Sequence, residues 1–95
     1  MKTLHLVLKS KWFDKIAAGE KTSEYRACTP YWNNRFMKNE MFPGLSCHKY
    51  KTVVFHRGYT NETMEFNIRF ISLTHLPNDL HLDICWEIKL GERLK

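Results

Sequence analysis

The sequence has no apolar run of about 18 residues, the length that a membrane-spanning helix needs. Its opening stretch, MKTLHLVLKS, alternates apolar and polar side chains and lacks the continuous apolar block of a signal peptide. We therefore expect a cytoplasmic protein with no membrane partner.

Motifs of metal and nucleophile chemistry are also missing. The three cysteines, Cys28, Cys47 and Cys85, are odd in number and show no CxxC spacing, which argues against a disulfide framework and a zinc knuckle. The histidines show neither HxxxH nor HExxH spacing, so we predict no metal site and no cofactor. The absence of a GxSxG elbow and of a phosphate-cradling glycine loop excludes serine hydrolases and nucleotide kinases.

What the chain does have is enough apolar material for one domain over residues 1–95, because 43% of its residues are hydrophobic. Its 15 Lys and Arg residues exceed its 10 Asp and Glu residues, which leaves a net charge of +5. A basic excess attracts polyanions, of which nucleic acid is the commonest, although the same charge also serves solubility alone.

Hydrophobic periodicity predicts the elements of the first half. Alternating leucines predict a strand over residues 4–8, followed by a helix with Ser10 as its N-cap and Gly19 as its C-terminal cap. A second strand is expected over 22–28, and the Thr29–Pro30 start signal predicts a short helix over 30–37. Trp12, Trp32 and Trp86 fall on apolar stripes and are expected in the core.

In the second half of the chain, the sequence pattern predicts strands. An irregular connection over 38–51 leads to a hairpin of strands 52–59 and 64–73, with Met64, Phe66, Ile68 and Phe70 on one face. A breaker over 75–79 precedes a last strand over 83–91, with Ile84, Trp86, Ile88 and Leu90 on one face. The predicted fold is an α+β domain whose sheet of about five to six strands curls into a small β-barrel, with two short helices early in the chain.

Charged and hydroxyl side chains gather in GEKTSEYR, residues 19–26. Side chains alternate along a strand, so Thr22, Glu24 and Arg26 share one face, and Lys21 lies in the preceding turn, from which it can reach Glu24. An exposed sheet face with a weak Glu24–Arg26 pair would give the same pattern.

This stretch resembles the GxKxxExR signature of the ASCH domain family at Gly19, Lys21, Glu24 and Arg26. The order of the strand LHLVLKS, the helix KWFDKIAAGEK, the PYW segment and FHRGY is similar to that of short stand-alone ASCH proteins of bacteria and their viruses. The resemblance implies a β-barrel related to the PUA domain, and RNA binding by a basic cleft that the signature lines.

One branch of that family hydrolyses the amide of N4-acetylcytidine, with a lysine at the position of Lys21, a threonine at the position of Glu24 and a later glutamate. Lys21 matches, but Glu24 departs from the threonine, and the stretch that supplies the later acid is shortened to HLPND. Another branch is linked to RNA cleavage. An anion beside Lys21 keeps that lysine charged, which opposes its use as a base or nucleophile.

Lys9, Lys11, Arg57 and Tyr59 are expected to extend the groove, with Tyr59 either stacking on a base or half buried in the hairpin. The leading hypothesis is an RNA-binding or modified-nucleoside-binding domain that uses these residues with Lys21, Thr22, Glu24 and Arg26. The first alternative is a small hydrolase of N4-acetylcytidine or RNA phosphodiesters, with Lys21 as catalytic group and Glu24 as its acid or orienting carboxylate. The second is a protein-interaction domain with a vestigial cleft.

Overall fold

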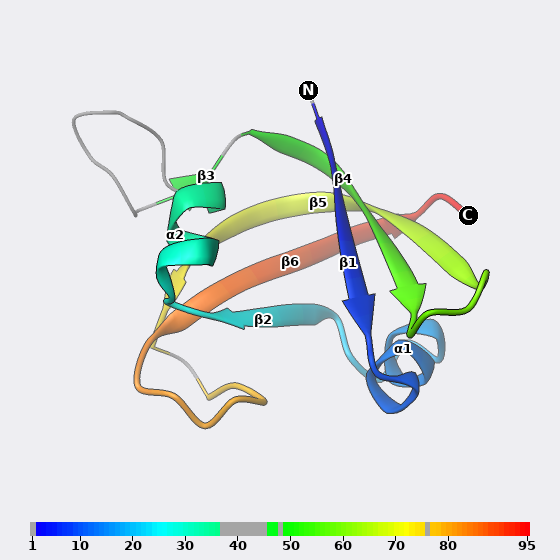
Figure 1. Cartoon of the computed structure of the whole chain (residues 1–95), viewed down its shortest axis with the longest axis horizontal. Helices are drawn as coiled ribbons and strands as arrows, with labels where there is room; N and C mark the ends of the chain where they lie inside the picture. Colours follow the sequence, from blue (N-terminus) through cyan, green and yellow to red (C-terminus); the bar gives the residue numbers. More distant parts are fainter. Residues whose placement is uncertain (1, 37–45, 48, 76) are drawn as a thin grey trace.

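A computed structural model describes residues 2–36, 46–47, 49–75 and 77–95 of the chain (Figure 1). Within these ranges the elements follow in the order β1 (Lys2–Leu8), α1 (Ser10–Ala17), β2 (Ser23–Ala27), α2 (Pro30–Phe36), β3 (Ser46–Cys47), β4 (Tyr50–Arg57), β5 (Thr63–Thr74) and β6 (Cys85–Arg93). Among the described residues no helix has the length and apolar character needed to cross a membrane.

All the described strands belong to one sheet, in the order β1, β4, β5, β6, β2, with β3 paired to β5. β1 and β4 are parallel, and the other pairs are antiparallel, including the predicted β4–β5 hairpin. Figure 1 shows that the sheet curls and that α1 and α2 lie at opposite ends of it. The predicted fold class, a small curled α+β barrel with two short helices early in the chain, is confirmed.

The core lies inside the curl. The leucines of β1 alternate as predicted, with Leu4, Leu6 and Leu8 buried between exposed neighbours. α2 is attached to this core through Phe36, whose ring centroid is 5.4 Å from that of Trp86. The indole Nε1 of Trp86 donates a hydrogen bond of 2.8 Å to Asn33 Oδ1, so the polar atom of this fully buried side chain has a partner.

Of the two caps that the sequence predicts for α1, the structure confirms the C-terminal one. The prediction that Ser10 is the N-cap of α1 is wrong, because the helix begins at Ser10, and Lys9 is the capping residue. Lys9 makes no side-chain cap, and its carbonyl accepts the backbone N–H groups of Trp12 and Phe13, both at 3.0 Å. Gly19 follows the helix with a φ of +78°, the left-handed conformation predicted for it.

β5 departs from its predicted alternation. Met64 and Phe66 are buried as expected, but Phe70 is 43% exposed, and its neighbour Ile71 is fully buried. The register against β6 shifts on both sides of Ile68. A bulge of this kind adds a residue to one strand and exchanges the two faces beyond it, so Phe70 points outward, contrary to the prediction.

Two boundaries are also corrected. β3 and the first residues of β4 lie in the stretch 38–51, which the sequence predicted to be irregular. Residue 37 of the predicted helix and residues 38–45 and 48 of this stretch lie outside the described residues. Ile84 precedes β6 and is exposed, whereas Trp86, Ile88 and Leu90 are buried as predicted.

We expect Phe36→Ala to lower the free energy of unfolding by about 3–5 kcal/mol, because it empties a fully buried site that joins α2 to the sheet. Phe70→Ala is the matched control, since it makes the same chemical change on the outer face and should cost less than about 1 kcal/mol. Urea unfolding monitored by circular dichroism measures both. Equal losses for the two variants would contradict the assigned faces of β5.

Candidate functional site

A tight turn brings Lys21 to the start of β2. The backbone N–H groups of Glu20 and Lys21 both donate to the Lys15 carbonyl, at 3.0 and 3.2 Å, immediately after the left-handed Gly19. β2 then pairs with β6, with Glu24 opposite Ile88. Lys21 therefore lies in the turn and Glu24 in the strand, as the sequence predicted.

The carboxylate of Glu24 contacts both neighbouring cations. Its Oε1 atom is 3.4 Å from Lys21 Nζ, and its Oε2 atom accepts a hydrogen bond of 2.7 Å from Arg26 Nη2. The side chains of Glu24 and Lys21 are only 9% and 8% exposed. Burying a charge is costly unless it is paired, so the two cations are what allow this carboxylate to lie inside the fold.

Lys21 Nζ is held among rings and carboxylates. It lies 5.1 Å from the ring centroid of Trp12 and 5.0 Å from that of Tyr25, both within the range of cation–π attraction. It also donates to Asp79 Oδ2. Burial lowers the pKa of Lys21 below its ordinary value, and the charge of Glu24 acts in the opposite direction.

Asp79 is a site residue that the sequence did not predict. It lies in the loop between β5 and β6, 58 positions from Lys21. Asn78 shapes this loop, because its Oδ1 accepts the backbone N–H of Leu80 at 3.0 Å and its Nδ2 donates to the Leu82 carbonyl at 2.9 Å. An Asn-Asp step marks a turn in a sequence but does not indicate what the turn will face.

Two cavities at this site share the rings of Trp12 and Tyr25 with a smaller one of about 190 Å³, and of the two larger cavities the first alone is lined by Lys21. The first, of about 350 Å³, is lined by charges of both signs: Lys15, Glu20, Lys21, Asp79, Glu87 and Lys89. The second, of about 390 Å³, lies between the end of β1 and β2 and is lined by Glu24, Arg26 and Lys9 together with apolar side chains such as Val7 and Leu80. The second cavity therefore combines apolar walls with a few polar groups, the usual character of a small-ligand site.

Arg26 extends from the second cavity toward α2. Its Nη2 is 3.5 Å from the carbonyl oxygen of Val7 on β1, and its guanidinium carbon is 5.1 Å from the ring centroid of Trp32. Its Nε is buried and has no hydrogen-bond partner in the described part of the chain. The Nε of Arg57 is in the same state, so this buried atom does not distinguish the two arginines.

Three of the other predicted site residues lie at or beside the cavities. Thr22 lines the first cavity and accepts a hydrogen bond of 3.0 Å from Lys89 Nζ, and Lys9 lines the second. Lys11 lies beside the site, with its Nζ 4.9 Å from the Trp12 ring.

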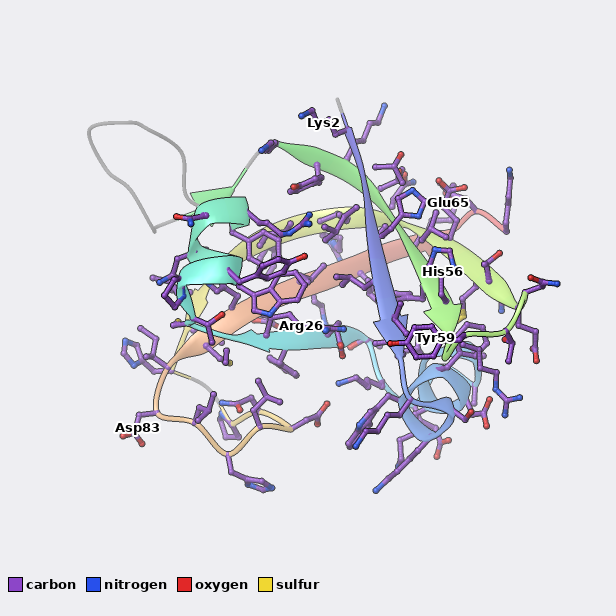
Figure 2. All side chains as sticks on the ribbon, viewed as in Figure 1. Lys2, Arg26, His56, Tyr59, Glu65 and Asp83 are labelled. Carbon is purple, nitrogen blue, oxygen red and sulfur yellow. The ribbon has the colours of Figure 1, made fainter. Side chains whose placement is uncertain are left out.

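Arg57 and Tyr59 are not brought into either cavity. Arg57 contacts Asp14 at 3.1 Å and Glu62 at 3.3 Å, so two carboxylates occupy its guanidinium. Tyr59 lies in the turn after β4 and is 99% exposed, so the half-buried alternative for this residue is wrong (Figure 2).

Trp12 also differs from its prediction. It is only partly buried, and it packs against the core and lines both cavities. An apolar stripe on a helix does not distinguish a core ring from a ring at the edge of a cleft. Trp86 is in the core as predicted, whereas Trp32, like Trp12, is only partly buried and packs against the core.

Comparisons with protein-family models, with curated proteins and with solved structures found no match to this chain.

Glu24→Gln should lower the pKa of Lys21 further, because the amide keeps the shape of the carboxylate but removes the charge that raises this pKa. The measurement is an NMR titration of the protein with its lysines ¹³C-methylated, with the Lys21 signal assigned by Lys21→Arg. Glu62→Gln is the matched control, since Glu62 contacts Arg57 and not Lys21. An unchanged or higher Lys21 pKa in Glu24→Gln would contradict the assigned role of Glu24.

Proposed function

We propose that this chain binds RNA or a modified nucleoside, as its resemblance to the ASCH family implies, and that the second cavity is the place where it binds. One observation carries the proposal: the buried Glu24 carboxylate, fixed between Lys21 and Arg26, faces a cavity that the rings of Trp12 and Tyr25 border. Fixed donors and acceptors beside aromatic rings suit an unpaired base, which is recognised by stacking and by hydrogen bonds to its edge.

Each group has a distinct task in this proposal. The Glu24 carboxylate accepts from an exocyclic amine, as acidic side chains do with the N4 amine of cytosine. Arg26 donates to a carbonyl or phosphate oxygen, for which its planar fork is well suited. The rings of Trp12 and Tyr25, each with Lys21 Nζ over it, border the base, and the apolar side chains of Val7 and Leu80 exclude water from it.

Because the charges around the site are paired within the protein, we expect it to recognise a particular base by hydrogen bonds and to attract nucleic acid in general only weakly. Arg26 and Lys21 both contact Glu24, and Lys21 also contacts Asp79, so the cations of the signature are compensated within the protein. Such groups contribute directed hydrogen bonds rather than a strong electrostatic field.

Arg26→Ala should weaken the binding of a fluorescein-labelled, single-stranded RNA by about tenfold or more, because it removes a charge-assisted donor from the second cavity. Fluorescence anisotropy over a series of salt concentrations measures the affinity, and the salt slope should fall by about 0.7 if Arg26 contacts a phosphate. Arg26→Lys, which keeps the charge for Glu24, gives a second test should the alanine variant unfold.

Arg57→Ala is the matched control. It removes the same side chain from a position where Asp14 and Glu62 already occupy the guanidinium, so RNA affinity should stay within about twofold. Wild-type protein that binds neither RNA nor nucleoside would refute the proposed function.

A second candidate function is hydrolysis of N4-acetylcytidine or of RNA. The observation that favours it is Asp79, a second carboxylate that reaches Lys21 from a distant part of the chain. A lysine with an acidic partner supplies the proton-transfer groups that amide hydrolysis requires. Glu24 opposes this use of Lys21, because its charge favours the protonated amine.

Under this second function, Lys21→Ala and Asp79→Asn should each reduce the hydrolysis of N4-acetylcytidine to cytidine and acetate by about 10²-fold or more. Glu24→Thr should raise the rate, because it frees Lys21 from an anion. Liquid chromatography of the nucleosides measures all of these rates, with Arg57→Ala as the control. A rate in wild-type protein no greater than that of Lys21→Ala would exclude this activity.

A further inference from the structure

A group of cations that forms no ion pair among the described residues lies away from the signature. A groove of about 500 Å³ opens between α2 and the first residues of β1 and β4, and it is lined by Lys2, Arg35 and Lys49 together with Tyr31 and Asn34. No carboxylate is among the described residues that line it. The first cavity at the signature, by contrast, contains three carboxylates beside its lysines. The field of these groove cations is therefore directed toward solvent.

The groove also offers a preorganised aromatic surface. Tyr31 is 57% exposed, and the guanidinium carbon of Arg35 lies 4.7 Å from its ring centroid. Stacking on the ring limits the motion of the Arg35 side chain, so less conformational entropy is lost when it binds a phosphate. Arginine beside an exposed tyrosine provides both interactions that single-stranded nucleic acids use, a phosphate contact and a stacking platform.

A continuous row of side chains joins this groove to the second cavity. Arg26, which lines that cavity, lies over Trp32 at 5.1 Å, and Arg35 lies over the same ring at 6.0 Å and over Tyr31 at 4.7 Å. Cations and rings thus alternate in the order Arg26, Trp32, Arg35, Tyr31. We call these four residues the cation–aromatic row.

The two sites are also a fixed distance apart. Val7 and Leu8 at one end of β1 line the second cavity, and Lys2 and Thr3 at its other end line the groove. At about 3.3 Å per residue, β1 separates them by about 20 Å. A strand of nucleotides stacked at about 3.4 Å covers that distance with about six nucleotides.

We propose that single-stranded RNA with one base in the second cavity continues along the cation–aromatic row and places its phosphates in the groove, where Lys2, Arg35 and Lys49 bind them. This inference rests on the proposed function and adds to it a stacked single strand of about six nucleotides as the ligand. Tyr31 stacks a base at the far end of the path. The groove supplies the salt-dependent affinity that the compensated signature lacks.

The test compares two labelled RNAs of mixed sequence, a 4-mer that is too short to span both sites and a 12-mer that reaches the groove. Arg35→Ala and Tyr31→Ala should each weaken binding of the 12-mer by about tenfold and leave the 4-mer within about twofold. Arg35→Ala should also reduce the salt slope of the 12-mer by about 0.7. Arg69→Ala removes an exposed arginine of β5 and is the matched control. Arg26→Ala should weaken both RNAs.

The outcomes separate the two proposals. If the wild-type protein binds both RNAs equally, or if Arg35→Ala and Tyr31→Ala leave the 12-mer unaffected, the groove is refuted and the proposed function stands. If Arg35→Ala weakens the 12-mer but Arg26→Ala does not, the groove binds RNA separately, and both the continuous path and the role that the proposed function gives to Arg26 are refuted. A wild-type protein that binds neither RNA refutes both proposals.

Discussion

Glu24 carries a carboxylate on a short strand at a depth where water barely reaches it, and the surrounding charges are arranged to make that burial possible. One cation comes from the turn before it and the other from two positions later on the same strand, so each carboxylate oxygen has its own partner. Removing either cation would leave a buried charge without full compensation. The positions of Lys21 and Arg26 therefore follow from the burial of Glu24.

The site is assembled from parts that the sheet holds at fixed positions. Trp12 comes from α1, Lys21 from a turn, Arg26 from β2 and Asp79 from the loop before β6. The core, to which Trp86 belongs, holds these segments in place through apolar contacts. A small domain thus provides a rigid setting in which a few polar groups keep their geometry.

Much of the fold and part of the site could be predicted from the sequence, because they depend on residues that are close together along the chain. Strand alternation placed the leucines of β1, a glycine marked the end of α1, and spacing placed Lys21 within reach of Glu24. The errors arose where non-local structure decided the outcome. The bulge in β5 exchanged Phe70 and Ile71, Asp79 reached Lys21 from a distant loop, and Arg57 was occupied by Asp14 of α1. No local pattern encodes such contacts.

The parallel pairing of β1 with β4 has a consequence for how the chain acquires its structure. Lys2 pairs with Tyr50, so about half of the chain separates the partners. Such non-local contacts are slow to form, because a long loop must close before they stabilise anything. Until β4 has been synthesised, β1 remains an unpaired strand with an exposed leucine face, the kind of segment that promotes aggregation. β2 waits longer still, because its partner β6 is synthesised after β4, so the exposure of β1 and β2 together sets the interval in which a nascent chain needs protection.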